Sequence, residues 1–389
     1  MEKREIIKKF LAIGSQLDFA SLEFFFKNQD KIDQFLQKTE SKQLPKIITM
    51  NFLRSFLKEP NIETLKTFSY KKRRVSVQDT VRYFTNTYEK LRNMIAGNPD
   101  LINLISINKI TTQTKNFSLI GSVREKDEEN KSITIEDTTG EIEIYINDSE
   151  IFHEIVVDDV LGIVCTKTDR PSAERIIWPD IPLRRSINKT DEDVYCLFVS
   201  GFNMGAENFN KKTYENFLEW LRKNKYDKLY IFILGGVSSK KEDIINFFDG
   251  LPLDSFKIFV PGEIDSNTNV DVLLIKQPTI LKIENKLIFL ICRGDVLSKY
   301  TKLWNETLNK VMLNLLKKRQ LDPVFDKQIY EEDQVLDVVP DVFVSQDSNE
   351  PSLLNYKGTT ILTTGSFAST PSFWLMNLKT RETIKIDFA

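Results

Sequence analysis

Histidine, the side chain most often used as a general base or metal ligand, occurs once in the 389 residues, at His153. Most serine triads, zinc peptidase sites and His-rich dinuclear metal centres need two or more residues of this kind in one place. His153 follows alternating strands in an acidic stretch. We expect a surface or half-buried histidine, with a lone general base as the alternative.

The three cysteines, Cys165, Cys196 and Cys292, have no CxxC spacing. Neither a zinc ribbon nor a disulfide framework is therefore supported, and we expect buried thiols in a reducing cytosol. The longest apolar runs, at 229–234 and 287–292, are far shorter than the roughly 20 residues that span a bilayer. The charged opening, residues 1–9, lacks a signal-peptide pattern. We expect a cytoplasmic, nucleoid-associated protein that does not bind a membrane.

The chain carries 54 Lys and Arg against 56 Asp and Glu, which excludes a uniformly basic coat, and 11% aromatic residues argue against disorder. Its length suggests two or three domains. Charge is uneven, because residues 1–80 have a net charge of +6 and residues 121–160 a net charge of -10. Such asymmetry indicates modules with different partners.

The N-terminal region predicts helices, since Ile6, Ile7, Phe10 and Leu11 have helical spacing and a second amphipathic stretch follows at 22–26. The polar stretch 58–74 has the composition of a linker and ends in the basic run 71–74. That run is interpreted as a solvated tether, with a nucleic-acid contact as the alternative.

From Phe117 the hydrophobic period changes to two, and a turn at 137–140 separates two of the alternating segments. About five short strands within 117–178 suit a small OB-type barrel. Because residues 121–160 are strongly acidic, they would repel phosphates. We therefore favour a structural or protein-binding barrel over one that binds single strands.

Beyond Pro182 apolar strands alternate with helical stretches, a pattern typical of a layered α/β domain. The expected strands are 194–199, 229–234, 256–260, 273–275 and 287–292. Ligands bind where such strands end. The candidate loops are 200–205, 235–239, 261–265, 292–295, 341–349 and 363–367.

Three motifs accompany these loops: LLKKRQLDP at 315–323, VPDVF at 339–343 and WPDIP at 178–182. With the ordered loop series, they resemble the small (B) subunit of archaeal D-family DNA polymerase. The resemblance implies a multidomain α+β and α/β chain. Its parts would be an N-terminal helical module with linker (1–75), an OB-fold β-barrel (76–188) and a calcineurin-like phosphoesterase α/β sandwich (189–389).

In active members of that family an Asp-x-His, a Gly-Asp, an Asn-His, a lone His and a Gly-His-x-His hold two metal ions. The corresponding positions here are Gly201 and Asn203, Gly236, Glu263 and Ile264, Arg293, and finally Gln346, Asp347 and Asn349, after Val344. Every expected ligand is changed, and the permanent cation Arg293 would repel a metal. The resemblance therefore implies a degraded site with no catalytic residue, metal or cofactor.

Three groups of residues leave alternatives open. Glu263, Asp265, Asp295 and Asp347 form either a rebuilt all-oxygen Mg or Mn site or solvated acids at loop ends, some paired with Arg293. The basic residues 317–319 contact DNA or stabilise a helix end. Phe202, Phe367, Phe373 and Trp374 are interface anchors or core residues.

These observations lead to the hypothesis of a non-catalytic small subunit that scaffolds the large catalytic subunit of a DNA polymerase. DNA would be reached through the complex, and the N-terminal module would recruit other replication proteins. One alternative is a metal-dependent 3′ to 5′ exonuclease or phosphodiesterase with a rearranged carboxylate site. Another is a free-standing OB protein that binds single strands in a salt-dependent way.

Overall fold

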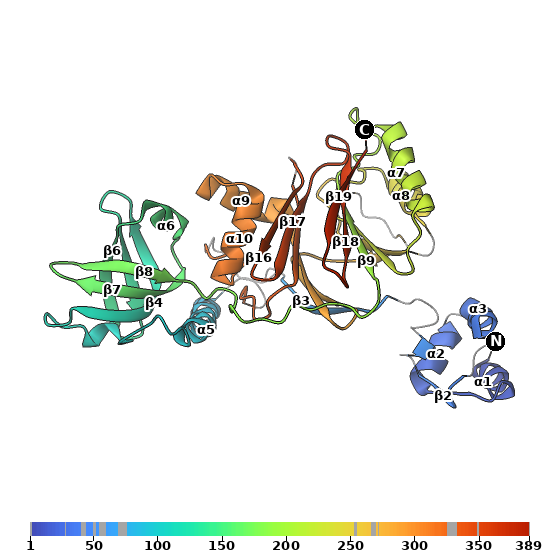
Figure 1. Cartoon of the computed structure of the whole chain (residues 1–389), viewed down its shortest axis with the longest axis horizontal. Helices are drawn as coiled ribbons and strands as arrows, with labels where there is room; N and C mark the ends of the chain where they lie inside the picture. Colours follow the sequence, from blue (N-terminus) through green and yellow to red (C-terminus); the bar gives the residue numbers. More distant parts are fainter. Residues whose placement is uncertain are drawn as a thin grey trace. The chain divides into compact units, whose positions relative to one another are not determined.

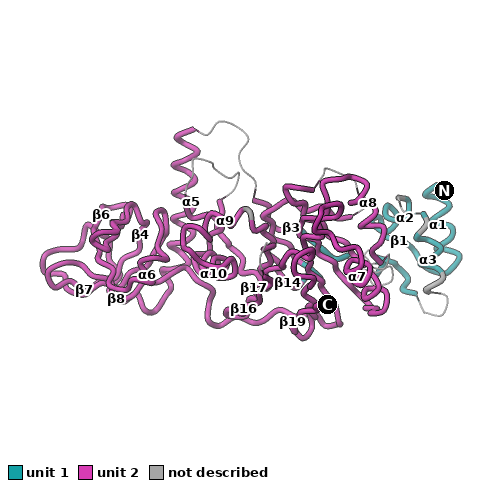
Figure 2. Tube along the Cα trace, turned by 90° about the horizontal axis from the view of Figure 1, so that it is seen from above, with its two compact units in different colours: residues 1–63, 283–285 teal, residues 64–282, 286–389 magenta. Residues whose placement is uncertain are grey.

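The structure is a computed structural model. It describes residues 2–27, 29–39, 44–49, 52–53, 60–68, 76–252, 255–265, 270, 272–324, 333–347 and 350–388. The chain divides into two compact units, drawn in two colours in Figure 2. Unit 1 comprises residues 1–63 with 283–285, and unit 2 comprises residues 64–282 with 286–389.

The described residues of unit 1 include short helices and a two-stranded parallel sheet. The helices are α1 (Lys3–Ala12), α2 (Phe19–Lys27) and α3 (Asp30–Thr39), and the strands are β1 (Gln16–Leu17) and β2 (Ile47–Ile48). The helical spacing of Ile6 and Phe10 predicts the inner face of α1, and both side chains are buried. Phe10 stacks on Phe25 with 4.9 Å between ring centroids. A small aromatic core thus holds the helices together.

A closed five-stranded barrel forms one part of unit 2, on the left in Figure 1. Its strands are β4 (Asn116–Asp127), β5 (Ser132–Asp137), β6 (Gly140–Ile146), β7 (Val160–Lys167) and β8 (Pro171–Ile177), in the order β4-β5-β6-β8-β7. Asp137 shapes the β5–β6 turn by accepting from the amides of Thr139 (2.7 Å) and Gly140 (3.1 Å). The short helix α6 (Ser149–Glu154) connects β6 to β7. The alternating residues of the sequence point into this barrel, where Ile133, Ile135 and Ile144 are buried.

The helix α5 (Val77–Ala96) packs on the outside of the barrel, beside β4 and β7. It begins with a capping box between Ser76 and Asp79. Leu91 and Ile95 of its last turns are buried. Gly162 of β7 admits Ile95, because a Cβ on this glycine would lie 2.7 Å from the Ile95 Cγ2.

Two six-stranded sheets form the larger part of unit 2. The first has the order β12-β11-β10-β9-β18-β19, and the second has the order β16-β17-β15-β14-β13-β3. The strands of the first are β9 (Tyr195–Val199), β10 (Leu229–Ile233), β11 (Phe256–Phe259), β12 (Leu273–Leu274), β18 (Ser372–Asn377) and β19 (Thr383–Asp387). Those of the second are β3 (Ile62–Thr67), β13 (Thr279–Ile283), β14 (Leu287–Ile291), β15 (Val342–Gln346), β16 (Ser352–Tyr356) and β17 (Thr359–Thr364).

The sheets pack face to face, and helices cover their outer faces (Figure 1). Phe232 of the first sheet stacks on Phe289 of the second, with 5.7 Å between ring centroids and an interplanar angle of 4°. The helices α7 (Lys211–Lys223) and α8 (Lys241–Gly250) share a core with the first sheet. The helices α9 (Gly294–Trp304) and α10 (Leu308–Lys318) share a core with the second. The predicted mixture of α and β structure with several sheets is confirmed.

The structure corrects the interpretation of 58–74 as a linker, and it distinguishes the two alternatives for the four aromatic residues. The stretch 58–74 is not simply a linker, because Ile62–Thr67 is strand β3 of the second sheet; the basic run 71–74 lies outside the described residues. All four aromatic residues considered as interface anchors are buried: Phe202, Phe367, Phe373 and Trp374. The core alternative therefore holds for them. The three-part division of the chain stays a prediction.

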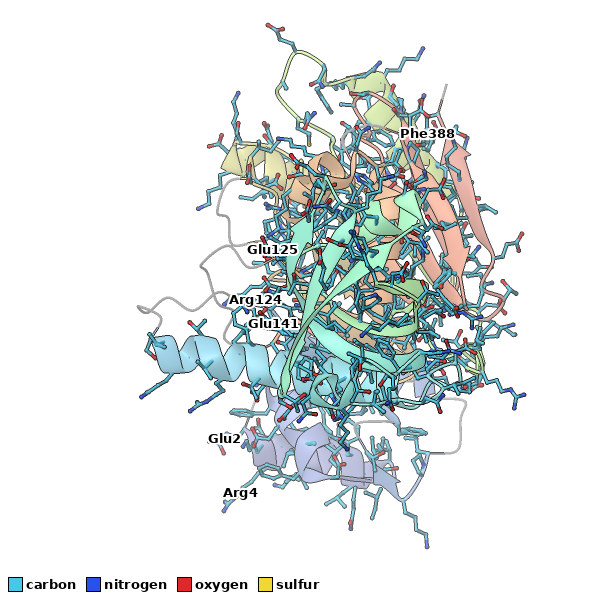
Figure 3. All side chains as sticks on the ribbon, turned by 90° about the vertical axis from the view of Figure 1, so that its left-hand side faces the viewer. Glu2, Arg4, Arg124, Glu125, Glu141 and Phe388 are labelled. Atoms are coloured by element: carbon cyan, nitrogen blue, oxygen red, sulfur yellow. The ribbon has the colours of Figure 1, made fainter. Side chains whose placement is uncertain are left out.

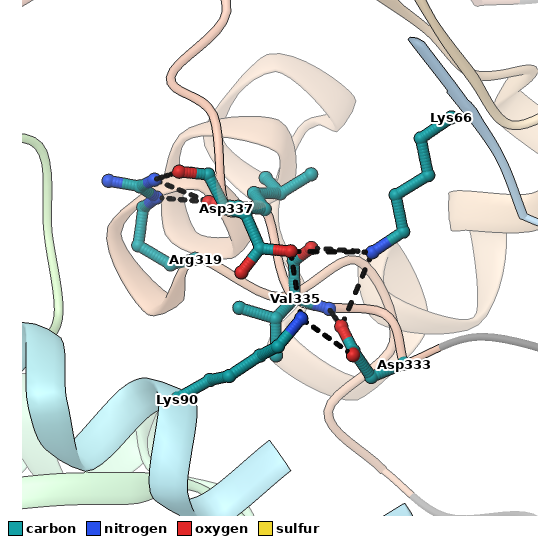
Figure 4. Close-up of polar contacts among 7 residues, drawn as sticks. Lys66, Lys90, Arg319, Asp333, Val335 and Asp337 are labelled. Atoms are coloured by element: carbon teal, nitrogen blue, oxygen red, sulfur yellow. Dashed lines mark hydrogen bonds and ion pairs between the residues drawn. The ribbon is translucent and has the colours of Figure 1, made fainter. Parts of the chain in front are cut away.

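An ion-pair cluster connects β3, α5 and the segment 333–337 within unit 2 (Figure 4). Lys90 lies 2.8 Å from a carboxylate oxygen of Asp333 and 2.9 Å from one of Asp337. Lys66 pairs with Asp333 at 3.3 Å and donates to the Val335 carbonyl at 3.1 Å. Burial alone would raise the pKa of Asp333, but the hydrogen bond from Lys90 and the charge of Lys66 hold it below its usual value. Asp333 is therefore stabilised as a carboxylate.

Candidate functional site

The predicted site residues lie around one cleft of about 940 Å³ at the ends of the strands. Parallel strands bring their carboxyl ends to one edge of a sheet, and the loops that follow β9, β10, β11, β14 and β15 meet there. Seven of the eight predicted positions line this cleft: Gly201, Asn203, Gly236, Glu263, Ile264, Arg293 and Asp347. The eighth, Asn349, lies outside the described residues. The structure thus brings together positions that are up to 146 residues apart in the chain.

Gly201 and Gly236 bring two loop backbones into direct contact. Their φ angles are +70° and +71°, a region that residues with a side chain rarely adopt. A Cβ on Gly236 would lie 2.8 Å from the Gly201 Cα, and a Cβ on Gly201 would lie 2.7 Å from the Ser366 Oγ. The space that an aspartate side chain would need at either position is therefore filled by the chain itself.

Backbone hydrogen bonds continue the pairing of β9 with β10 beyond the strand ends. The Gly201 amide donates to the Gly235 carbonyl at 3.0 Å, and the Asn203 amide donates to the Gly236 carbonyl at 2.8 Å. The Met204 amide then donates to the Val237 carbonyl at 2.7 Å. These hydrogen bonds hold the loop after β9 against the loop after β10.

The carboxylate of Asp265 is bound by four backbone amides. One oxygen accepts from Gly236 (3.0 Å) and Gly262 (2.6 Å), and the other accepts from Val237 (2.7 Å) and Ser238 (3.1 Å). Successive amides that converge in this way form a concave site for an anion. Asp265 therefore connects the loop after β10 to the loop after β11, and these amides already bind its oxygens. Its sequence position gave no signal for this role, because acids are common in loops.

Arg293 places a guanidinium in the cleft, with only 13% of the side chain exposed. Its Nη1 donates to the Pro261 carbonyl at 2.8 Å, and its backbone amide donates to the Gln277 Oε1 at 2.7 Å. Glu263 is 3.9 Å from the guanidinium and 79% exposed, so this ion pair is weak. A fixed cation at this position opposes the entry of a metal ion by charge.

Gln346 and Ile264 have different positions in the cleft. A Cβ on Gly235 would lie 3.3 Å from the Gln346 Oε1, so this amide occupies space beside the glycine pair. Ile264 is 53% exposed and offers no ligand atom. Asp347 donates its backbone amide to the Thr364 carbonyl at 2.8 Å, which fixes the loop after β15.

Among the described residues, no group of three or more His, Cys, Asp or Glu side chains is arranged to hold a metal ion. The side chain of Asp295 and the residue Asn349 lie outside that description. Of the acids considered for a rebuilt site, Asp265 is bound to backbone amides and Glu263 is mostly exposed.

The basic motif at 317–319 is largely buried, which neither interpretation of it anticipated. Lys318, 4% exposed, pairs with Asp159, donates to the Glu154 carbonyl at 2.9 Å and lies 4.0 Å from the ring centroid of Trp178. Burial lowers the pKa of Lys318 and raises that of Asp159, and the charge of each partner opposes the shift of the other. The motif thus joins α10 to the barrel.

Arg319 has a similar structural role. Its Nε donates to the Leu336 carbonyl at 2.9 Å and its Nη2 donates to the Asp337 carbonyl at 3.1 Å. Burial lowers the pKa of the guanidinium to about 10. The side chain is 4% exposed and does not present its charge to solvent.

The remaining predicted residues have simple environments. His153 is exposed at the end of α6, and its Nε2 lies 2.8 Å from the Trp304 carbonyl oxygen. Cys165, Cys196 and Cys292 are buried thiols. In the part of the chain that the structure covers, no helix has the length and hydropathy needed to span a bilayer.

The described architecture is a closed five-stranded barrel joined to a two-sheet sandwich with a cleft at its strand ends. No family model matches the chain. Two solved structures are similar to half of it. One is described as a novel archaeal phosphodiesterase (11% identity, TM-score 0.34, 50% of this chain and 100% of that one). The other is vacuolar protein sorting 29 from Cryptosporidium parvum (14% identity, TM-score 0.33, 51% and 100%). These scores are too low to bear on fold or function.

Curated relatives give a more extensive likeness: the chain is similar to proteins named DNA polymerase II small subunit. Identity is 24% over 386 residues with the protein of Pyrococcus furiosus, covering 82% of this chain and 62% of that one. It is 27% over 325 residues with that of Archaeoglobus fulgidus (69% and 66%). It is 22% over 361 residues with that of Methanothermobacter thermautotrophicus (76% and 74%). The resemblance to the archaeal D-family small subunit is confirmed, and the chain spans less than two thirds of the length of the first two relatives.

Proposed function

We propose that the chain is a non-catalytic small subunit of a DNA polymerase, which scaffolds a large catalytic subunit during replication. The names of its relatives support this assignment. The observation that carries the non-catalytic part is the contact between the Gly201 and Gly236 backbones, at the two positions where the family places metal-binding aspartates.

The chemistry of the cleft supports the same proposal. Hydrolysis by two metal ions needs carboxylates and imidazoles that hold the ions close together, so that one activates water and the other stabilises the leaving oxygen. Here two positions have no side chain, and a third carries the Arg293 guanidinium. Among the residues that the structure describes, no set of His, Cys, Asp or Glu side chains in the cleft is positioned to replace these ligands.

The barrel and the N-terminal helices complete the proposal. A closed barrel in the order β4-β5-β6-β8-β7 has the strand neighbours of an OB fold, and its acidic sequence favours a protein partner over a phosphate backbone. We assign residues 1–75 to a helical module that recruits other replication proteins. DNA is reached through the complex, in the cytoplasm at the nucleoid.

The absence of nuclease activity is tested on the purified chain with a 5′-labelled single-stranded oligonucleotide in Mn²⁺ and in Mg²⁺. We expect no shortening of the oligonucleotide beyond a buffer control. Degradation from the 3′ end that stops on chelation, and that is lost in Glu263→Ala or Asp347→Ala, would instead establish the alternative of a rearranged carboxylate site.

The scaffolding function is tested by copurification of the tagged chain from its native host. A large polymerase subunit is expected in equal amount after size exclusion. A chain that elutes alone at cellular concentration contradicts the assignment, whatever the nuclease assay shows.

A further inference from the structure

A second cavity, of about 670 Å³, lies between α5 and the barrel, away from the strand-end cleft. Its apolar walls come from Phe84 and Tyr88 of α5 and from Leu104, Ile120 and Val160 on the barrel side. Phe84 and Tyr88 are four residues apart and therefore share one face of the helix. The volume is typical of a ligand-sized site.

The charged residues that line this groove are mostly acidic. Glu89, Glu136, Asp137 and Asp158 line it, against a single arginine, Arg92. Arg92 is hydrogen-bonded to Tyr88, which ties it to the helix. The groove therefore combines apolar walls with an acidic rim. Its barrel side belongs largely to the acidic stretch 121–160.

Thr87 supplies an independent indication that the groove is incomplete. Its side chain lines the cavity and is 5% exposed, yet its hydroxyl has no hydrogen-bond partner. A buried hydroxyl without a partner is unfavourable, because it has left water without regaining a hydrogen bond. Leu104 on the opposite wall is 40% exposed although it is apolar. A ligand that covers Leu104 would remove this apolar surface from water.

We propose that the groove between α5 and the barrel binds a basic amphipathic segment of a partner protein. Apolar side chains of the segment contact Phe84, Leu104 and Ile120, while its Lys and Arg side chains face the acidic rim. An apolar centre within a polar rim is the usual anatomy of a protein interface. Nucleic acid is disfavoured because four carboxylates would repel its phosphates. The inference does not rest on the loss of the metal site.

Binding is measured with the full chain and three probes. The first is a fluorescent peptide with Leu on one helical face and Lys on the other. The second has Glu in place of each Lys, and the third is a single-stranded oligonucleotide. We expect the Lys peptide to bind, with an affinity that falls as salt rises, and the other two probes to bind at least about tenfold more weakly.

Substitutions then locate the binding site. Glu89 and Glu136 are exposed, and their reversal in Glu89→Lys and Glu136→Lys should weaken the Lys peptide by roughly five- to thirtyfold together. Glu125→Lys is the matched control: Glu125 is an exposed acid of the barrel that does not line the groove (Figure 3), and its reversal should leave affinity within about twofold. Equal weakening by all three reversals would mean diffuse charge attraction and would overturn the proposal.

Protection of a thiol from labelling shows whether the peptide covers the groove itself, which diffuse charge attraction would not do. All three native cysteines are buried, so a cysteine introduced by Thr85→Cys on the groove wall is selectively reactive with a maleimide. Saturating Lys peptide should slow this labelling at least about fivefold and leave labelling of Gln113→Cys, on an exposed loop, unchanged. Unchanged labelling at Thr85→Cys, or protection by the oligonucleotide instead, contradicts the assignment.

Discussion

Gly201 and Gly236 differ from Gly205, a left-handed glycine of the same unit, by what surrounds them. Gly205, with φ +82°, would place a Cβ 3.1 Å from the Asp243 Oδ2, the end of a flexible side chain. At Gly201 and Gly236 the nearest atoms include backbone or Cα atoms that cannot withdraw. The close approach of the loops therefore leaves no room for a side chain at either position.

Alanine substitutions at Gly201, Gly236 and Gly205 distinguish two effects on stability: steric crowding of the new Cβ and the cost of a positive φ angle. All three variants place a Cβ at positive φ, which costs about 1–2 kcal/mol. We expect Gly201→Ala and Gly236→Ala to lose roughly 1–3 kcal/mol more than Gly205→Ala, because only they force backbones apart. Urea unfolding measures the differences. Equal losses at all three positions would show that the loops open without cost.

The buried pair of Lys318 and Asp159 gives a second prediction for single residues. Lys318→Met leaves Asp159 as an uncompensated buried carboxylate, so the free energy of unfolding should fall by about 3–5 kcal/mol. Lys317→Met is the neighbouring control. Lys317 is 25% exposed, and its ion pair with Glu154 is weak because the two charged atoms are 4.0 Å apart, so this variant should lose less than about 1 kcal/mol of unfolding free energy. Addition of Asp159→Asn to Lys318→Met should restore part of the loss. A Lys318→Met protein as stable as Lys317→Met would refute the structural role of the motif.

At the scale of elements, the cluster in Figure 4 makes the joint between β3, α5 and 333–337 sensitive to pH. The pKa of Asp333 is lower in the folded chain than its usual value, so the unfolded chain binds more protons. The stabilisation by Asp333 is therefore present above the unfolded pKa and is lost as the pH falls through the lowered folded value.

Asp333→Asn tests this dependence. It should cost about 1–2 kcal/mol at pH 7, and much less at an acidic pH below the lowered folded pKa of Asp333, where this carboxyl is neutral in both the folded and the unfolded chain. The free energy of unfolding is measured at both pH values, with Asp387→Asn as the control, because that carboxylate is 60% exposed. A loss for Asp333→Asn that does not change with pH would mean that its charge is irrelevant to the joint.

The sequence predicts elements well where their period is strict. The barrel strands alternate over several residues, and the strands 229–233 and 287–291 are continuous apolar runs between polar loops. Strand β3 was missed because it lies at the edge of its sheet and is mostly exposed, so its sequence, IETLKT, is as polar as a tether. The convergence of the strand-end loops was predictable, because parallel strands end at one edge.

What the sequence could not reveal are the contacts made across long separations. The partners of Lys318 are Asp159 and Trp178, more than 130 residues earlier, and a basic run gives no sign that it is buried. The four amides on Asp265 depend on the positions of two loops, which no local pattern encodes. The Thr87 groove likewise depends on how α5 lies against the barrel.

At the scale of the whole molecule, the cleft should contribute nothing to stability through a bound cation. A ligand that binds only the folded chain raises its melting temperature, and its removal lowers it. The melting temperature of the chain purified without chelator should therefore change by less than about 1 °C on addition of EDTA. Differential scanning calorimetry measures this shift. A drop of several degrees, reversed by Mn²⁺, would point to ions held at the strand ends.

The carboxylate of Asp265 affects which ligands the cleft can bind. Amide groups that converge beyond a strand are the kind of seat into which a phosphoryl oxygen fits, and here a tethered carboxylate sits in it permanently. An incoming phosphodiester would have to displace the Asp265 carboxylate from these amides. Because Asp265 is part of the same chain, its carboxylate stays beside them at any protein concentration. The Asp265 carboxylate thus occupies this amide site from within the chain, and metal ligands introduced elsewhere in the cleft would leave it occupied.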